Sequence, residues 1–317
     1  MPRSNHKINS LIIKGGHKKK ITWLNILNAG ANEIAYLRRE FNFAPEDLRD
    51  ATVNITALHA KVKGRENYIF LAIRFPYYSQ ENETINGAEI DFFIGHDLLV
   101  TLHDNKINLL KKLFDGYQKQ NGKQITPIDS SVDLYYQITD KLLDWSFNLL
   151  DDMSKTIDDI EDTIFSHKSR SAVTTLLDLR RNAINFRTIT KNYQMVFEKF
   201  EKLRAEAGLS DSHTPFPAVI DKTKDLWNTI ENRQEMLEAL YATNESILNY
   251  RLNDIMKTLT IFSVIVFPLT LLAAIFGMNT LNGMPFINHP LGFWWIIAIM
   301  LLGSFSMLLF FKRKGWM

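Results

Sequence analysis

Between the two most apolar runs of the chain lies a short polar stretch, FGMNTLNGMPFINHP, residues 276–290. It contains three asparagines, two glycines and two prolines, and no carboxylate, lysine or arginine. Gly277 lets a helix end and the backbone turn, and Asn279 then offers a neutral amide oxygen. Mg²⁺ loses its waters reluctantly and keeps several of them when a protein binds it. A ring of such amides, one from each copy of the chain around a symmetry axis, would bind the hydrated ion through its waters.

The apolar run that precedes this stretch, residues 258–278, carries its hydroxyl groups on one helical face. Positions spaced alternately by three and four residues define that face, because they return to the same side of an α-helix. They are Asn253, Met256, Thr260, Ser263, Phe267, Thr270 and Ala274. Every hydroxyl of the run except Thr258 lies there. The pattern is typical of a pore lining; the alternative is that Ser and Thr help helices pack and bond back to their own carbonyls.

No Asp, Glu, Lys or Arg occurs between Lys257 and Lys312, a stretch of 54 residues. One membrane span needs roughly 20 apolar residues, so two transmembrane helices are predicted, at 258–278 and 291–311, with an outer loop at 280–290. The alternative is two buried core helices of a soluble protein. Basic residues flank the spans on one side only: Arg251, Lys257, Lys312, Arg313 and Lys314. By the positive-inside rule, we expect a multi-pass protein of the cell (inner) membrane with both termini in the cytoplasm.

The first part of the chain alternates strand and helix signals. Residues 1–20 are basic, contain no apolar signal core, and are expected to be a poorly ordered start. Residues 21–125 predict a cytosolic α/β domain whose sheet has mainly non-crossover connections. The expected strands are 21–27, 57–64, 67–78, 88–95 and 98–104. Two hairpins are expected, one pairing 57–64 with 67–78 and the other pairing 88–95 with 98–104. The expected helices are 31–41, 45–51 and 105–119.

From residue 126 onward the pattern is helical. Residues 126–217 predict amphipathic helices that pack on a stalk, and one of these helices covers 176–203. The segment 140–164 carries eight acids against two lysines, which indicates a solvated face or, alternatively, a cation site. A near-3.5 repeat then predicts one helix over 218–279, about 90 Å long at 1.5 Å per residue. The expected fold class is an α+β cytosolic domain with a long helical stalk that continues into the membrane as the first span.

The motifs together resemble the CorA magnesium-transporter family. GMN at 277–279, MP at 284–285 and a two-span end closing with FKRKGWM (311–317) carry the resemblance. EIDFFIGHDLLVTLHD (89–104) resembles the family's cytosolic sheet, and residues 252–279 resemble its pore helix. The resemblance implies a funnel-shaped homopentamer with two transmembrane helices per subunit, in which the long helices line the pore.

The resemblance also implies roles for individual residues. Gly277, Met278 and Asn279 would form the selectivity filter, with Asn279 binding the metal through its hydration shell. The implied pore-lining or gate positions are Asn253, Met256, Leu259, Phe267, Thr270 and Ala274. Leu259 is the neighbour of Thr260 on the hydroxyl face, so the two sets of positions agree within one residue. Lys312, Arg313 and Lys314 would form a basic ring near the cytoplasmic mouth.

Two departures from the family pattern concern the loop and the start of the stalk. Phe286 follows the MP of the loop, where the family often has a carboxylate, and His289 is the only titratable group of the loop. Ala218 occupies the place of a regulatory acid, although Asp221 lies one turn further on. The cytosolic regulatory metal site therefore stays unassigned. The alternative is a ZntB-like transporter of zinc or of a broad range of divalent cations, with proton coupling.

Composition narrows the remaining classes. The chain has no cysteine, which excludes disulfides and thiolate metal sites. No nucleophile–base pair, no phosphate-binding glycine loop and no closely spaced histidine pair is present, so we expect no enzyme activity, no organic cofactor and no nucleic-acid partner. The expected partners are copies of the chain itself, divalent cations and membrane lipids. The expected function is passive transport of Mg²⁺, with Co²⁺, Ni²⁺ and Zn²⁺ as alternative ions; a membrane-anchored interaction protein is the alternative without transport.

Overall fold

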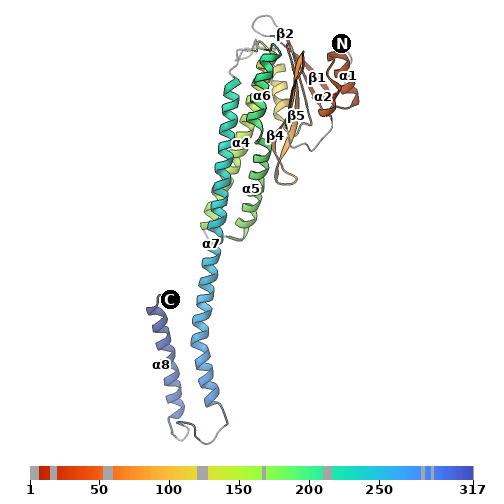
Figure 1. The fold of residues 1–317 in the computed structure, drawn as a ribbon. Helices are drawn as coiled ribbons and strands as arrows, with labels where there is room; N and C mark the ends of the chain where they lie inside the picture. Colours follow the sequence, from red (N-terminus) through yellow and green to blue (C-terminus); the bar gives the residue numbers. More distant parts are fainter. Residues whose placement is uncertain are drawn as a thin grey trace. The chain divides into compact units, whose positions relative to one another are not determined.

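The computed structural model describes residues 7–14, 20–52, 60–119, 128–165, 169–209, 216–279, 283–286 and 289–316. The chain forms two compact units, Met1–Leu240 and Tyr241–Met317. In chain order, the elements are β1 (Ile8–Lys14), β2 (Lys20–Leu27), α1 (Ala31–Phe41), α2 (Pro45–Asp50), β3 (Lys61–Gly64), β4 (Tyr68–Ser79), β5 (Thr84–Gly95), β6 (Leu98–His103), α3 (Leu109–Lys119), α4 (Ser131–Phe165), α5 (Ser169–Thr190), α6 (Tyr193–Glu206), α7 (Phe216–Phe276) and α8 (Gly292–Arg313) (Figure 1).

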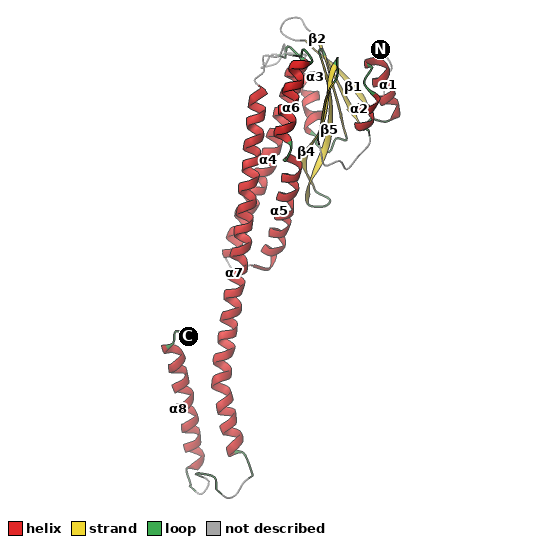
Figure 2. Ribbon diagram, viewed as in Figure 1, coloured by secondary structure: helices red, strands yellow, loops and turns green. Residues whose placement is uncertain are grey.

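The first unit is built on a six-stranded sheet with the strand order β1-β2-β6-β5-β4-β3 (Figure 2). Neighbouring strands are antiparallel except β2 and β6, which are parallel and are the one crossover pair of this sheet. The two predicted hairpins, β3 with β4 and β5 with β6, are both present. The longest pairing joins β4 to β5, from Tyr68 opposite Gly95 to Ser79 opposite Thr84. The predicted mixed α/β fold, followed by a long helix that continues into the first of two apolar segments, is confirmed.

Residues 8–14 differ from the expectation of a poorly ordered start. They form the edge strand β1, antiparallel to β2, with Ile8 opposite Ile26 and Lys14 opposite Lys20. Ile13 is only 3% exposed, so the strand contributes an apolar side chain to the core. The basic residues on both sides of INSLIIK dominate the composition of the first 20 residues and hid this short apolar run. Residues 1–6 and 15–19 lie outside the described residues.

The helix predicted over 176–203 is two helices, α5 and α6, separated by a turn at Lys191 and Asn192. The ring of Tyr193 is buried directly after this turn, and its hydroxyl donates to the carbonyl of Arg74 at 2.6 Å. A contact with strand β4 therefore fixes where α6 begins. Neither glycine nor proline marks the break, so local propensity does not reveal it.

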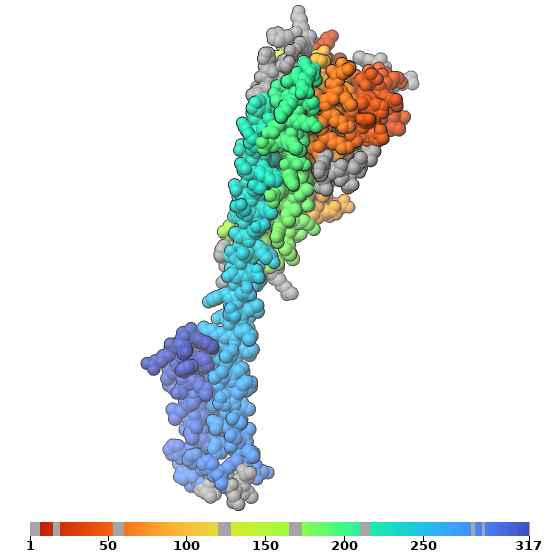
Figure 3. All heavy atoms as spheres, viewed as in Figure 1, coloured from red at the N-terminus to blue at the C-terminus, as the bar shows by residue number. Residues whose placement is uncertain are grey.

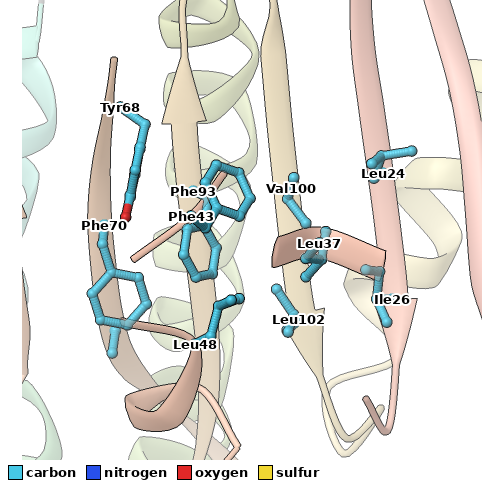
Figure 4. Packing of buried hydrophobic residues seen from close by; sticks show 11 residues of the cluster. Leu24, Ile26, Leu37, Phe43, Leu48, Tyr68, Phe70, Phe93, Val100 and Leu102 are labelled. Carbon is cyan, nitrogen blue, oxygen red and sulfur yellow. The ribbon is translucent and has the colours of Figure 1, made fainter. Parts of the chain in front are cut away.

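One face of the sheet is covered by α1 and α2 and carries an apolar cluster (Figure 4). Its members come from the strands β2, β4, β5 and β6 and from the α1–α2 segment: Leu24, Ile26, Leu37, Phe43, Leu48, Tyr68, Phe70, Ala72, Phe93, Val100 and Leu102. Phe43 stacks on Phe93 with ring centroids 4.4 Å apart. Burial of these side chains, at roughly 25 cal/mol per Å² of apolar surface, fixes α1 and α2 on the sheet.

The helices α4, α5 and α6 pack on the other face of the sheet, where aromatic rings meet. Tyr135 of α4 lies 5.1 Å from Phe92 of β5 and 4.7 Å from Phe200 of α6, measured between ring centroids. Phe200 in turn lies 5.0 Å from Phe216, the first residue of α7. Figure 3 shows the atoms of this helical layer, in green, against those of the strands, in orange. The start of α7 is therefore part of the core of the first unit.

Charged contacts also join α7 to the helices of the first unit. The ammonium of Lys222 donates to the carboxylates of Asp140 and Asp144 on α4, at 2.6 and 2.5 Å. Further along, Arg187 of α5 donates to Glu231 at 3.1 Å. These ion pairs fix the rotation of α7 about its axis, because each can form only when one particular face of α7 points toward its partner helix.

Asp47 of α2 is the most completely satisfied charge of the unit. Its carboxylate is fully buried and accepts hydrogen bonds from Arg65 at 2.9 Å, Tyr68 at 2.8 Å and Lys63 at 3.1 Å. Burial alone would raise the pKa of Asp47, but the bonds from Arg65, Tyr68 and Lys63 outweigh it and hold the pKa below its usual value. The network joins α2 to β3, β4 and the turn between them.

Replacing Asp47 by Ala leaves its donors without their acceptor. We expect the unfolding free energy of the purified chain to fall by about 2–3 kcal/mol near neutral pH, because one partner of a buried charged network is lost. The pKa of Asp47 is lowered by folding, so its contribution is present above the ordinary carboxyl pKa of about 3.9 and is lost as the pH falls through the folded value. The difference between parent and variant should therefore shrink in acid, as measured by denaturation followed by circular dichroism.

The matched control is Glu46→Gln, one residue away. The side chain of Glu46 is 70% exposed and approaches Arg65 only to 3.5 Å. We expect a change within about 0.5 kcal/mol for this exposed pair. Equal destabilisation by both substitutions would contradict the importance of the buried carboxylate.

Candidate functional site

The second unit contains the apolar part of the chain. Within the described residues, two helices, α7 and α8, are long and apolar enough to cross a membrane. The most apolar segment of each helix is not buried inside the protein. Lys257, just before the uncharged stretch, donates to the carbonyl of Gly315, just after α8, at 3.4 Å. The two apolar segments therefore run antiparallel, with their charged ends together (Figure 1).

The helix α7 ends at Phe276, and the sequence GMN follows it. The amide of Gly277 donates to Ala273 at 2.9 Å, and that of Met278 donates to Ile275 at 3.2 Å, which tightens the last turn. Asn279 comes next and is exposed. Its side chain makes no hydrogen bond to any residue that the structure describes. Residues 280–282 lie outside the described part of the chain.

The hydroxyl face of α7 combines two properties. Thr260 donates to the carbonyl of Met256 at 2.7 Å, and Thr270 donates to that of Val266 at 2.9 Å. The hydroxyl protons of both threonines are used inside the helix, as the packing alternative expects, while their oxygen lone pairs remain able to accept. Asn253 and Ala274 are exposed and Ser263 is half-exposed. Helical spacing places all seven predicted positions along α7, and a single chain leaves this face uncovered.

Three large apolar side chains follow the same strip of α7. The exposed fractions of Met256, Leu259 and Phe267 are 59%, 56% and 71%. Off the strip, Phe262 is 65% exposed as well, so exposure in one chain does not single out the pore face. Pro268 lies inside the helix, a feature given no weight in the sequence prediction. A proline has no amide hydrogen, so the carbonyl of Val264 loses its usual helical donor there.

The basic residues after the second span lie in a defined helix end. Lys312 and Arg313 are in the last turn of α8, and Lys314 caps it, which suits cations because the helix dipole is negative there. Gly315 has φ of 69°, and Trp316 folds back so that its ring stacks on Phe311 at 5.7 Å. The predicted basic ring residues therefore form one cluster at the same end of the unit as Lys257.

The described part of the loop between the two apolar helices is joined to the start of α8. The carbonyl of Phe286 accepts from the amide of His289 at 3.2 Å, and Nδ1 of His289 accepts from the amide of Leu291 at 3.2 Å. A side chain on Gly292 would collide with the Phe286 carbonyl, at 2.1 Å from an added Cβ. Phe286 itself has φ of 72°, a strained conformation for an aromatic residue. The imidazole thus supplies a hydrogen bond to the N-terminus of α8.

The acid-rich helix α4 offers no ready-made metal centre. Among the residues that the structure describes, no group of three or more His, Asp or Glu side chains could hold a metal ion. Asp140 and Asp144 are occupied by the ammonium of Lys222. Burial would raise the pKa of Asp144, but Lys222 and Lys141 outweigh it and lower that pKa. Asp221 pairs with Lys224 at 2.9 Å.

These elements define a class: a membrane protein with an amino-terminal α/β domain, one very long helix and a two-span end. The family model described as CorA-like Mg²⁺ transporter protein matches residues 18–313, and the chain belongs to that family. The resemblance drawn from the GMN motif is therefore confirmed. Transport of divalent cations is also confirmed at the level of the family, because the family is one of transporters and not of enzymes.

Relatives match along nearly the whole chain. The protein YfjQ of Bacillus subtilis (strain 168) is 27% identical over 303 residues, covering 93% of this chain and 89% of YfjQ. The cobalt/magnesium transport protein CorA of Thermotoga maritima is 23% identical over 299 residues, covering 93% of this chain and 83% of the relative. The complete CorA magnesium transporter from Methanocaldococcus jannaschii matches all of both chains with a TM-score of 0.78 at 19% identity, which shows a shared fold.

The apolar strip generates a prediction about pore closure. Rings of Leu259 and Phe267 would exclude water from a narrow pore and so stop ions. We expect Phe267→Ser or Leu259→Ser to raise the basal leak of divalent cations from liposomes. Phe262→Ser is the matched control, because this phenylalanine is equally exposed but lies off the strip, and its leak should equal that of the parent. An unchanged leak in both strip variants would put the gate elsewhere.

Proposed function

We propose that this chain forms a homopentameric channel for passive uptake of Mg²⁺, with Co²⁺ and Ni²⁺ as further ions, and that the GMN turn selects the hydrated ion. The observation that carries the proposal is Asn279, an exposed amide directly after a 61-residue helix, without a hydrogen-bond partner in the described residues. A neutral oxygen ring binds the waters of the ion and avoids the tight hold of carboxylates. Gly277 and Met278 set the turn that presents the amide.

An oligomer follows from the number of spans. Two helices cannot enclose a pore, and a lone chain would expose Ser263 and Thr270 to lipid, where polar groups are costly. Association around an axis places the face of Asn253, Met256, Thr260 and Ala274 toward water. The number five rests on the resemblance to the CorA family.

The proposed topology places both termini in the cytoplasm of a cell membrane, with the loop 280–290 outside. With residues 8–14 joined to the sheet as β1, we retain the rest of the division: an α/β domain over 21–125, helices over 126–217, a stalk and pore helix over 218–279, a second span over 291–311 and a tail over 312–317. The uncharged loop and the basic residues at the other ends of both spans support this orientation.

Zinc is the alternative cargo. Zn²⁺ favours nitrogen and sulfur ligands, whereas Mg²⁺ favours oxygen. The proposed pathway offers amide and hydroxyl oxygens, and its only sulfurs are the thioethers of Met256 and Met278. The Thermotoga maritima relative is named a cobalt/magnesium transport protein, which also supports Mg²⁺ and Co²⁺. Flux of Mg²⁺, Co²⁺, Ni²⁺ and Zn²⁺ into liposomes, with and without a pH gradient, separates the two cargoes and tests proton coupling.

The decisive substitutions are at Asn279. Asn279→Leu removes the oxygen that would accept hydrogen bonds from the waters of the ion. We therefore expect Mg²⁺ uptake to be abolished while the oligomer persists. Asn279→Asp would put about five carboxylates around one axis, whose repulsion raises some of their pKa values. That variant should still bind cations but lose selectivity or throughput. The measurement is the initial rate of Mg²⁺ uptake in liposomes.

Asn279→Gln is the control, because it keeps the amide and should keep part of the uptake. If Asn279 served only to shape the turn, Asp would replace it without loss, since both residues suit turns. Normal uptake by the Leu variant would reject Asn279 as the filter.

The oligomeric state has its own measurement. Native mass spectrometry of the detergent-solubilised protein should give five times the chain mass of 36.7 kDa. A dimer in both detergent and lipid would overturn the proposed channel, because four helices would then have to form the pore.

A further inference from the structure

The apolar face of the sheet ends at a buried carboxylate, Asp91. This residue lies on β5, two positions before Phe93 of the apolar cluster and therefore on the same face as that cluster. Its partners on the neighbouring strands are Ala72 of β4 and Leu102 of β6. Neither side chain can donate a hydrogen bond. The side chain of Asp91 is nevertheless only 5% exposed.

The carboxyl group of Asp91 bonds no basic side chain among the described residues. Its Oδ1 atom is buried and has no hydrogen-bond partner among the described residues. Burial first, and then the carboxylates of Glu89 and Asp50, raise the pKa of Asp91 well above its usual value. Lys61 opposes this effect, but its ammonium bonds Asp50 at 2.8 Å. A cation bound at Asp91 would give the buried carboxylate the partner of opposite charge that it lacks.

A cavity of about 210 Å³ lies beside Asp91. It is lined by Asn28, Ala29, Ala51, Thr52, Glu89, Asp91, Leu102, His103 and Asp104. No lysine or arginine is among these residues. Two of the three carboxylates already have a basic partner: Glu89 bonds Arg74 at 3.1 Å, and Asp104 bonds Lys106 at 2.9 Å. Asp91 is the lining carboxylate that has none in the described chain.

The imidazole of His103 is not available as a ligand. Its Nδ1 accepts from the amide of Asn105 at 3.1 Å, so Nε2 carries the hydrogen and donates to Oδ1 of Asn25 at 3.0 Å. Burial lowers the pKa of His103 to about 4, so the ring stays neutral. The side-chain atoms around the cavity that remain available as metal ligands are therefore oxygens. Oxygen donors suit Mg²⁺, Ca²⁺ and Mn²⁺ and do not favour Zn²⁺.

We propose that this cavity binds one hard divalent cation, directly through Asp91 and otherwise through water. No set of three acidic or histidine side chains in the described residues could surround the ion, so the ion must keep most of its waters. At about 30 Å³ per water in the liquid, the cavity has room for roughly seven such volumes, enough for an ion with its first shell. The ion would join the sheet at β5 to the ends of β2 and α2, where Asn28 and Thr52 lie. This cytosolic-domain site is separate from the proposed filter and does not depend on it.

The experiment measures Mn²⁺ binding to the full-length protein in detergent by the loss of the free-ion paramagnetic resonance signal. The parent chain should bind one Mn²⁺ more per chain than Asp91→Asn, or bind that ion at least about tenfold more tightly, as expected for loss of a ligand. Mg²⁺ should displace this Mn²⁺. Asp115→Asn on α3, exposed and outside the cavity, is the matched control and should bind as the parent does.

Thermal unfolding separates a lost ion from a damaged fold. In a chelator, Asp91→Asn should unfold at the same temperature as the parent or higher, because a buried carboxyl group without a partner has been replaced by a neutral amide of the same shape. Mg²⁺ should raise the unfolding temperature of the parent and not that of the variant. Ala29→Leu, which fills the cavity and leaves Asp91 in place, should also lose the Mn²⁺ site.

Two outcomes would overturn the proposal. One is equal Mn²⁺ stoichiometry and affinity in the folded parent and Asp91→Asn proteins; the other is a Mg²⁺-dependent unfolding temperature that survives both cavity variants. Asn279→Leu should lose transport and keep this Mn²⁺ site. A failure of the cavity site is thereby distinguishable from a failure of the proposed filter.

Discussion

The hydrocarbon interior of a membrane offers no water to backbone amides and carbonyls, and the two apolar segments within the 54 consecutive uncharged residues have to meet that condition. The α7 and α8 helices meet it by pairing those groups internally. The α7 helix runs into the apolar region without a break. Its start is fixed in the first unit by the ion pair of Lys222 with Asp140 and by the packing of the Phe216 ring. Charges begin again only at Lys257 and Lys312, at the ends of the two spans.

The first unit shows two opposite ways of burying a carboxylate. Asp47 accepts bonds from three side chains and has a lowered pKa, so its charge is stable inside the protein. Asp91, on the same face of the sheet, meets Ala72 and Leu102 and has a raised pKa. The first arrangement ties α2 to the sheet without any ligand. The second leaves a buried carboxyl oxygen without a partner beside a cavity, where we propose that a cation binds.

Sequence patterns predicted those elements whose signals are local. The β3–β4 and β5–β6 hairpins have turn residues between apolar runs, and α2 has a proline at its start. β1 was missed because lysines flank it, and the break before Tyr193 because a bond to Arg74 causes it. The isolation of Asp91 depends on neighbours from two other strands, so no local pattern reveals it. The pore face stays a prediction, since exposure in one chain does not single out one face in the apolar part of α7.

The bond from the Leu291 amide to Nδ1 of His289 has a consequence for the loop that precedes α8. The first amides of a helix have no partner inside the helix, so an acceptor outside it has to satisfy them. At the start of α8 one imidazole nitrogen accepts from Leu291, while the backbone amide of the same histidine donates to the carbonyl of Phe286. His289 therefore ties the described end of the loop to α8, and a side chain that cannot accept, such as Leu, would remove the imidazole half of that connection.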